Sequence, residues 1–224
     1  MTRLPGERLD RRPAAAGAPA DRADPADAAP LVGVLALQGD VLEHTRALRA
    51  VGVRPLPVRS VADLEAVDGL VLPGGESTAI SRALGRAGLD EPLARRIADG
   101  LPVLGTCAGL ILLSDELVED DALPRPGGIA VRTRRNAYGP QTASFDVRVE
   151  VAGLDGGPMD VAFIRAPRIE AVLGDAVDVL AEVDGAPVAV QQGARIGLAF
   201  HPEVTGDLRL HARLADLVRR RTGR

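Results

Sequence analysis

Short aliphatic runs alternate with helix-like segments along most of this chain, and this alternation limits the fold more than any other feature. From Leu31 onward, runs of Val, Leu, Ile and Ala end at Gly, Pro or Asp, and segments with apolar residues at helical spacing follow them. Such runs are typical of strands that are buried on both faces. Strands that alternate with helices assemble into a parallel sheet covered by helices. The sequence therefore predicts an α/β fold with a mostly parallel central sheet flanked by helices.

The predicted elements fall into two parts that meet near Gly128. Strands are expected at residues 31–37, 53–58, 69–72 and 101–105, and then at 129–133, 145–151, 161–164, 177–183, 188–191 and 196–200. Helices are expected at residues 41–50, 60–67, 77–86, 91–98, 108–117 and 207–221. Because strands follow one another after Gly128 without helices between them, we expect additional antiparallel strands there.

The chain is expected to form one domain behind a tail. Its 224 residues suit a single α/β domain. Residues 1–30 consist mostly of Ala, Pro, Asp and Arg and contain almost nothing that a core could bury. We predict a disordered tail over residues 1–30 and a folded domain over residues 31–224.

Composition excludes several kinds of site and partner. With one Cys, the chain cannot close an internal disulfide or build a multi-thiolate metal centre. The net charge is −4 and no basic stripe marks a nucleic-acid surface. No apolar run approaches the ~20 residues that span a bilayer. We expect a cytoplasmic protein that holds no metal and binds neither nucleic acid nor a membrane.

The only cysteine lies in a turn that two glycines flank. Residues 101–110 read LPVLGTCAGL, so an apolar strand runs into Gly105, Cys107 and Gly109, and a helix opens directly afterwards. This arrangement is typical of a nucleophile elbow, where glycines avoid collisions at a sharp turn and the nucleophile is exposed. A helix N-terminus also favours the thiolate. Cys107 is therefore a candidate nucleophile, and the alternative is a small buried apolar residue.

A second polar pair follows the last predicted strand. His201 and Glu203 flank Pro202, and in an extended chain this spacing directs both side chains to one face. Pro202 favours that extended geometry. The carboxylate can then orient one imidazole nitrogen while the other takes the thiol proton. The alternative is a surface His beside an ordinary Glu. The remaining histidines, His44 and His211, lie in predicted helices and are expected to be structural or solvent-facing.

A glycine-rich turn follows the strand predicted at residues 69–72. Gly74 and Gly75 allow backbone amides to approach a ligand closely, as in a phosphate cradle or an oxyanion hole. A P-loop is excluded because the chain contains no Lys, and the glycine pattern of dinucleotide-binding folds is absent. The alternative is an ordinary helix start that Ser77 caps.

Taken together, these motifs resemble those of class I glutamine amidotransferases, which carry a Cys-His-Glu triad. The similarity is most specific to the glutaminase subunits of pyridoxal 5'-phosphate synthase. The matching segments are residues 34–39 (VLALQG), 72–78 (LPGGEST), 105–109 (GTCAG), 135–139 (RNAYG), 163–167 (FIRAP) and 201–203 (HPE). Only the tail lies outside this resemblance.

The resemblance implies roles for individual residues. Cys107, His201 and Glu203 match the catalytic triad of the family. The positions that match its glutamine-binding residues are Gly75, Glu76, Ser77, Arg135, Ile164 and Arg165. Backbone amides of Gly75 and Ala108 are expected to form the oxyanion hole, and Gln38 and Gly39 are expected to line the same site. Arg135 carries the charge that the α-carboxylate of glutamine requires.

By the same resemblance, the chain is expected to hydrolyse L-glutamine and to pass ammonia to a (β/α)8-barrel synthase subunit that assembles pyridoxal 5'-phosphate. No cofactor is expected on this chain. Three alternatives stay open: the glutaminase of another amidotransferase such as imidazole glycerol phosphate synthase, a non-catalytic regulatory subunit of the same fold, or a thiol hydrolase or peptidase without a synthase partner. A lost triad member would mark the non-catalytic subunit, and all three members are present.

Overall fold

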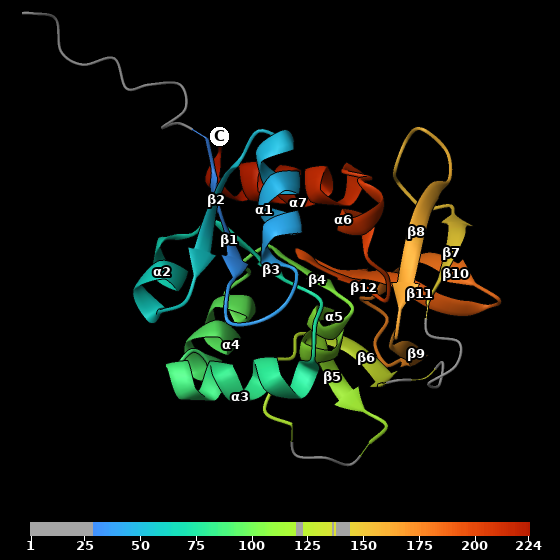
Figure 1. Ribbon diagram of the computed structural model, residues 1–224, viewed down its shortest axis with the longest axis horizontal. Coiled ribbons are helices and arrows are strands. Elements are labelled where there is room, and N and C mark those ends of the chain that lie inside the picture. Colours follow the sequence, from blue (N-terminus) through green and yellow to red (C-terminus); the bar gives the residue numbers. More distant parts are fainter. Residues whose placement is uncertain (1–28, 120–122, 136, 138–143) are drawn as a thin grey trace, which may run out of the picture.

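A computed structural model describes residues 29–119, 123–135, 137 and 144–224. Its centre is a sheet with the strand order β10-β11-β12-β4-β3-β1-β2 (Figure 1). These strands are β1 (Leu31–Leu35), β2 (Arg54–Val58), β3 (Gly69–Leu72), β4 (Val103–Thr106), β10 (Asp178–Val183), β11 (Ala186–Gln192) and β12 (Arg195–Leu198). Strands β12, β4, β3, β1 and β2 are mutually parallel, whereas β11 is antiparallel to both of its neighbours. The predicted α/β fold with a mostly parallel sheet is confirmed.

Helices cover both faces of this sheet (Figure 1). They are α1 (Val41–Ala50), α2 (Val61–Ala66), α3 (Ser77–Ala87), α4 (Asp90–Ala98), α5 (Ala108–Leu113), α6 (Pro202–Thr205) and α7 (Arg209–Thr222). Helices α1 and α7 lie on one face, and α3, α4 and α5 lie on the other. None of these described helices is long and apolar enough to cross a membrane. Residues 1–28 lie outside the described part of the chain, so the disordered tail stays a prediction.

Two smaller sheets adjoin the central one. The first has the order β5-β6-β9, with β5 (Ser114–Leu117), β6 (Ile129–Arg134) and β9 (Arg168–Val172). The second is the antiparallel pair β7 (Ser144–Val149) and β8 (Met159–Ile164). Both lie toward the β12 side of the central sheet (Figure 1). The expected antiparallel strands after Gly128 are therefore present, and β8 ends close to the loop that follows β12.

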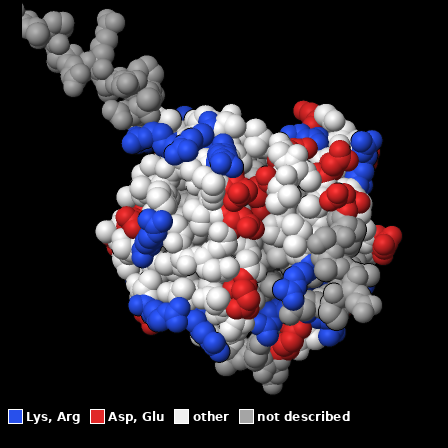
Figure 2. Space-filling view, viewed as in Figure 1, with Lys and Arg blue, Asp and Glu red and all other residues white. Residues whose placement is uncertain are grey.

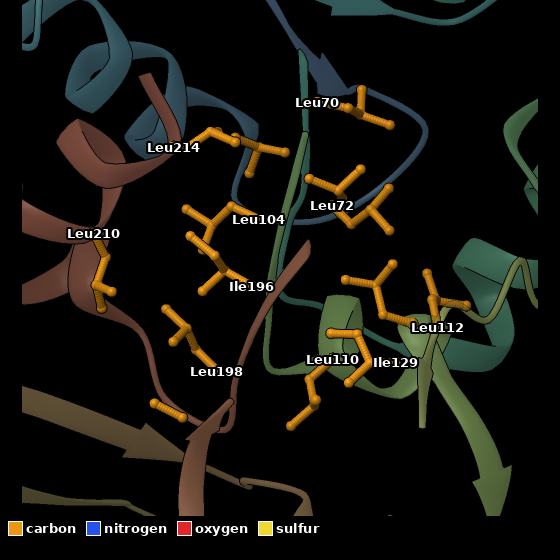
Figure 3. Packing of buried hydrophobic residues seen from close by; sticks show 14 of the residues in the cluster. Leu70, Leu72, Leu104, Leu110, Leu112, Ile129, Ile196, Leu198, Leu210 and Leu214 are labelled. Carbon is orange, nitrogen blue, oxygen red and sulfur yellow. The ribbon is translucent and has the colours of Figure 1, made fainter. Parts of the chain in front are cut away.

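Leucine and isoleucine side chains fill both sides of the sheet. In Figure 3, Leu110 and Leu112 lie on one side of the strands, and Leu210 and Leu214 of α7 lie on the other. The side chains Leu70, Leu72, Leu104, Leu110, Leu112, Ile129, Ile196, Leu198, Leu210 and Leu214 have no exposed surface. Each one stabilises the fold by about 1.5–3 kcal/mol through burial. The strands are thus held firmly from both sides, and the loops at their ends start from fixed positions.

The structure corrects the expected elements at three places. The helix predicted at residues 108–117 ends at Leu113, and Ser114–Leu117 instead form β5, which pairs with β6. The Ser114 hydroxyl lies 2.8 Å from the Leu110 carbonyl and 2.6 Å from Thr133 Oγ1 of β6. This long-range pairing overrides the helical spacing of the segment. The sequence pattern also missed two short elements, β9 and α6.

Charged side chains of both signs are interspersed on the face that Figure 2 shows. Arginines lie mainly around the margin of this view, acidic groups lie between them, and uncharged surface covers much of the centre. On the described residues of this face, no continuous basic stripe is present of the kind that tracks a phosphate backbone.

Candidate active site

The ends of four parallel strands bring the predicted site residues together. Strands β1, β3, β4 and β12 are neighbours that run in one direction, so their carboxyl ends lie at the same edge of the sheet. The segments after these ends carry Gln38, Gly75, Cys107 and His201, which line a cavity of about 530 Å³. Clefts at the carboxyl ends of strands are the usual binding sites of open α/β sheets.

Cys107 lies in a strained turn between β4 and α5. Its φ of 48° is in the left-handed region, which a residue with a side chain rarely adopts. The turn is closed tightly because a Cβ on Gly109 would lie 2.1 Å from the Leu72 carbonyl oxygen, and one on Gly105 would lie 2.6 Å from the Gly109 backbone. The steric role predicted for the two glycines is confirmed. The Cys107 amide donates to the Leu198 carbonyl at 2.8 Å, which ties the elbow to β12.

His201 lies between the thiol and a buried carboxylate. Its Nδ1 is 2.7 Å from Glu203 Oε1, and its interaction with the Cys107 side chain raises its pKa. The His201 amide donates to the Ala162 carbonyl of β8 at 3.0 Å, which fixes the backbone beneath the ring. Both His201 and Glu203 are buried. The three residues of the predicted triad are thus brought together in one chain of contacts.

The backbone that joins His201 to Glu203 is helical, whereas the sequence predicted an extended geometry. Pro202 is the first residue of the short helix α6, and His201 is its N-cap with φ −116° and ψ 87°. Pro is favoured at this position because its fixed φ suits a helix and its missing N–H would have had no helical partner. The contact between the two side chains therefore depends on a helical first turn rather than on a strand.

Electrostatics in the site favour a charged His201 next to an ionised Glu203. Burial lowers the pKa of His201, but its hydrogen bonds with Cys107 and Glu203 outweigh burial and raise the pKa to about 10. Burial raises the pKa of Glu203, yet hydrogen bonds with His201 and His44 outweigh it and hold the pKa well below its usual range. An imidazolium stabilised in this way is the natural counterion of a thiolate.

All six residues predicted to bind glutamine line the same cavity as Cys107 and His201. They are Gly75, Glu76, Ser77, Arg135, Ile164 and Arg165. Gly75 has a φ of 146°, and a Cβ there would lie 2.6 Å from Gln38 Oε1, so this position requires glycine. Ala108 opens α5 directly after Cys107, which leaves its amide near the thiol at the helix N-terminus. The Cys107 thiol faces the Ile164 carbonyl at 3.9 Å.

Glu76, rather than Ser77, caps helix α3. The Glu76 carboxylate accepts from the Thr78 amide at 2.9 Å and from the Ala79 amide at 2.7 Å. The alternative that Ser77 caps this helix is wrong, because Ser77 is already the first helical residue. Gln38 Oε1 accepts from the Glu76 amide at 3.1 Å, which links the loop after β1 to the glycine-rich turn.

Two arginines contribute positive charge to the cavity. Arg135 is half-buried, and its Nη1 donates to Thr78 Oγ1 at 3.1 Å. Arg165 has a φ of 48°, a strained conformation that turns the chain at the end of β8. Guanidinium groups form paired hydrogen bonds with carboxylates. The cavity can therefore accept a small molecule that carries a carboxylate.

Sequence reasoning missed Asp40 as a cavity residue. Its Oδ2 lies 3.6 Å from His201 Nδ1, and both residues line the cavity. Burial raises the pKa of Asp40, and the nearby His201 only partly offsets this. The sequence signal that could have identified Asp40 is its position in the segment after β1, because such segments line the cavity at this edge of the sheet. Asp40, His201 and Glu203 place ligand atoms within 4.8 Å of one another. A metal there would have to displace the bond between His201 and Glu203.

Of the two positions expected for His44 and His211, structural or solvent-facing, the structure shows the first. Neither His44 nor His211 faces solvent, because both are completely buried. His44 Nε2 lies 3.4 Å from Glu203 Oε1, directly behind the candidate triad. The helical spacing of α1 left both positions open for residue 44, and it does not reveal which distant residue lies against it.

Residues 34–219 match the model of the SNO glutamine amidotransferase family. The pyridoxal 5'-phosphate synthase subunit PdxT of Salinispora arenicola (strain CNS-205) is 54% identical over 197 residues, which are 85% of this chain and 98% of the relative. The protein of the same name from Nocardia farcinica (strain IFM 10152) is 52% identical over 212 residues, which are 90% of this chain and 92% of the relative.

Solved structures show the same architecture. A crystal structure of a glutamine amidotransferase is 42% identical and superposes with a TM-score of 0.79, covering 84% of this chain and 98% of the other. A chain in the structure of PurLQS from Thermotoga maritima is 18% identical, with a TM-score of 0.57 over 87% of this chain and 99% of the other. The second similarity concerns the fold alone.

Proposed function

This chain belongs to the SNO glutamine amidotransferase family, and on that premise we propose that it releases ammonia from L-glutamine through Cys107, His201 and Glu203. The observation that carries the proposal is the buried His201, which lies 2.7 Å from Glu203 and interacts with the Cys107 side chain in the same cavity. Such a chain of contacts is the arrangement that activates a nucleophile.

In the first half of the reaction, the Cys107 sulfur attacks the side-chain amide carbon of glutamine. His201 holds the proton that the thiol has lost, and Glu203 stabilises the resulting imidazolium. The amides of Gly75 and Ala108 donate to the oxyanion of the tetrahedral intermediate. His201 then protonates the departing nitrogen, so ammonia leaves and a γ-glutamyl thioester remains on Cys107.

In the second half, water cleaves this thioester. His201 is now neutral and takes a proton from the water as it attacks the thioester carbonyl. The C–S bond breaks, glutamate leaves, and the proton returns to the thiolate and imidazole pair. The same oxyanion hole serves both halves because both pass through a tetrahedral centre at the same carbon.

The remaining cavity residues position free glutamine. Arg135 binds the α-carboxylate, for which a guanidinium is well suited. Arg165 and the Ile164 carbonyl, at the end of β8, hold the substrate from the opposite wall, and Glu76 and Ser77 complete the cavity beside Gly75. The presence of all six side chains or backbone segments around one cavity supports this assignment.

We further propose that the ammonia serves the synthesis of pyridoxal 5'-phosphate. The relatives with 52–54% identity carry the name of a pyridoxal 5'-phosphate synthase subunit, which favours this pathway over imidazole glycerol phosphate synthesis. The receiving partner is a (β/α)8-barrel synthase subunit. The reaction belongs in the cytoplasm, because a reducing compartment keeps the single thiol free.

Glutamine hydrolysis by purified protein tests the proposal. Glutamate and ammonia release are measured with and without the barrel synthase subunit, for the natural chain and for Cys107→Ala. Loss of the nucleophile should reduce kcat by at least about 10³-fold, since binding and oxyanion contacts alone sustain little turnover. Gly85→Ala serves as the matched control, because a Cβ at Gly85 meets nothing within 4 Å. Retained turnover in Cys107→Ala would exclude this mechanism.

A further inference from the structure

A chain of buried polar groups continues behind the candidate triad. His44 of α1, His211 of α7 and Thr106 of β4 have no exposed surface. His44 Nε2 lies 3.4 Å from Glu203 Oε1 and 3.1 Å from Thr106 Oγ1. On its other side, His44 Nδ1 lies 2.9 Å from His211 Nε2. Cys107, His201, Glu203, His44 and His211 therefore form one continuous line of contacts from the cavity into the interior.

The contacts define which ring nitrogens carry protons. Burial, together with the nearby His44, lowers the pKa of His211 to about 3, so His211 is neutral. Within the described part of the chain, His211 Nδ1 has no hydrogen-bond partner. A buried N–H without an acceptor is costlier than a bare lone pair. The His211 proton therefore lies on Nε2 and is donated to His44 Nδ1, which leaves the His44 proton on Nε2, where Thr106 Oγ1 at 3.1 Å and Glu203 Oε1 at 3.4 Å both face it.

Glu203 depends on few contacts for its orientation. Its Oε1 lies 2.7 Å from His201 Nδ1 and 3.4 Å from His44 Nε2. Among the described residues, Oε2 is buried without a hydrogen-bond partner. The carboxylate is thus held at one oxygen only, between two imidazoles. If His44 were absent, the carboxylate could rotate about its side-chain bonds and loosen its contact with His201.

We propose that His44, with its tautomer set by His211, is a positioning residue that holds Glu203 in the orientation needed to orient and charge His201. The proposal rests on the proposed function, because it assigns to His44 a role in the same triad. His44 does not line the cavity and acts on the substrate only through Glu203 and His201. Charged groups near this line include Asp40 beside His201, Glu43 near Asp40, and Asp207 near His211.

Substitution of His44 by each of the two amide residues, Gln and Asn, tests the roles of its two ring nitrogens separately. The amide nitrogen of Gln reaches the place of Nε2, so His44→Gln keeps a donor toward Glu203. The amide of Asn reaches only the place of Nδ1, so His44→Asn keeps the His211 contact and loses the Glu203 contact. We expect His44→Asn to lower kcat for glutamine about 10-fold or more, as loss of a supporting partner does at other sites, without changing KM. His44→Gln should restore most of kcat.

Alkylation of Cys107 provides a readout that a purely structural role would not change. Since the chain has one Cys, the iodoacetamide reaction reports on this thiol alone. A loosened His201 stabilises less thiolate, so the alkylation rate of His44→Asn at pH 7 should fall several-fold below that of the natural protein and of His44→Gln. Leu48→Ala is the matched control, because Leu48 is a buried residue of the same helix outside this line of contacts. It should lower the melting temperature and leave alkylation and kcat unchanged.

Wild-type kcat and alkylation in folded His44→Asn would overturn the proposal, as would a loss of equal size in His44→Gln. If His44→Asn does not fold, His211→Asn tests the line from its far end, since the shorter side chain no longer donates to His44 Nδ1. Wild-type behaviour of that variant would also refute the role. Neither result affects the proposed function, which fails only if Cys107→Ala remains active.

Discussion

Replacing Gly74 by alanine would place a methyl group against the ring of His201. Gly74 lies in the turn between β3 and α3, and a Cβ at this position would lie 2.3 Å from His201 Cε1 and 3.0 Å from Asp40 Oδ2. Ordinary contacts of a Cβ begin near 3.4 Å, so the ring and the methyl group must separate by about 1.1 Å (3.4 minus 2.3). The substitution therefore perturbs the candidate site without touching the nucleophile.

The size of the effect follows from this displacement. His201 cannot retreat toward Glu203, because these side chains are already 2.7 Å apart. Either the imidazole turns away from Cys107 or the glycine-rich turn moves outward with Gly75. A displacement of about 1 Å at a reacting group can cost 10²-fold in rate, which corresponds to about 2.7 kcal/mol in the activation free energy. We expect kcat/KM of Gly74→Ala to fall by about 10²-fold.

Steady-state glutamine hydrolysis and thermal unfolding, measured on the same preparations, test this expectation. Overpacking is expected to lower the free energy of unfolding by about 1–3 kcal/mol, which leaves the variant folded at room temperature. Gly85→Ala, within α3, adds a methyl group in open space and should stabilise the helix by about 0.5–1 kcal/mol with unchanged turnover. If Gly74→Ala keeps wild-type kcat/KM, the imidazole position is not as tightly constrained as the geometry implies, and the reasoning is refuted.

Two further predictions concern substrate binding and acid stability. Arg135→Gln removes the cation assigned to the α-carboxylate and should raise KM for glutamine about 10- to 100-fold, as expected for a lost charged hydrogen bond of about 1.5–3 kcal/mol, with kcat largely kept; an unchanged KM would contradict the assignment. Burial lowers the pKa of His211 to about 3, whereas an imidazole in the unfolded chain titrates near about 6.5. Below about pH 6.5 the unfolded chain therefore binds a proton that the folded chain does not, and the free energy of unfolding falls as the pH drops. Between pH 7.5 and pH 5, the free energy of unfolding measured in urea should fall by about 2 kcal/mol from this cause. His211→Gln should lose that part of the pH dependence; an identical slope in both proteins would argue against a neutral buried His211.

Local sequence identified the candidate nucleophile and most of the framework. The glycines around Cys107 predict a sharp turn, and the need for Gly105 is local, because a side chain there would collide with the nearby Gly109 backbone. The alternation of aliphatic runs and helical segments predicts a parallel sheet, whose strand ends must meet at one edge. These two facts bring Cys107 and His201 to the same edge although 94 positions separate them.

Tertiary structure decided the features that depend on contacts between distant segments. Residues 114–117 pair with β6 instead of continuing the helix. Backbone hydrogen bonds to that strand and the buried Ser114 hydroxyl outweigh a weak local preference for helix. The turn at Pro202 became helical, and the His201–Glu203 contact formed there nonetheless. The place of His44 behind Glu203 depends on how α1 and α7 pack across one face of the sheet. Helical periodicity shows that a residue faces inward, but only the packed fold selects the buried groups that it meets.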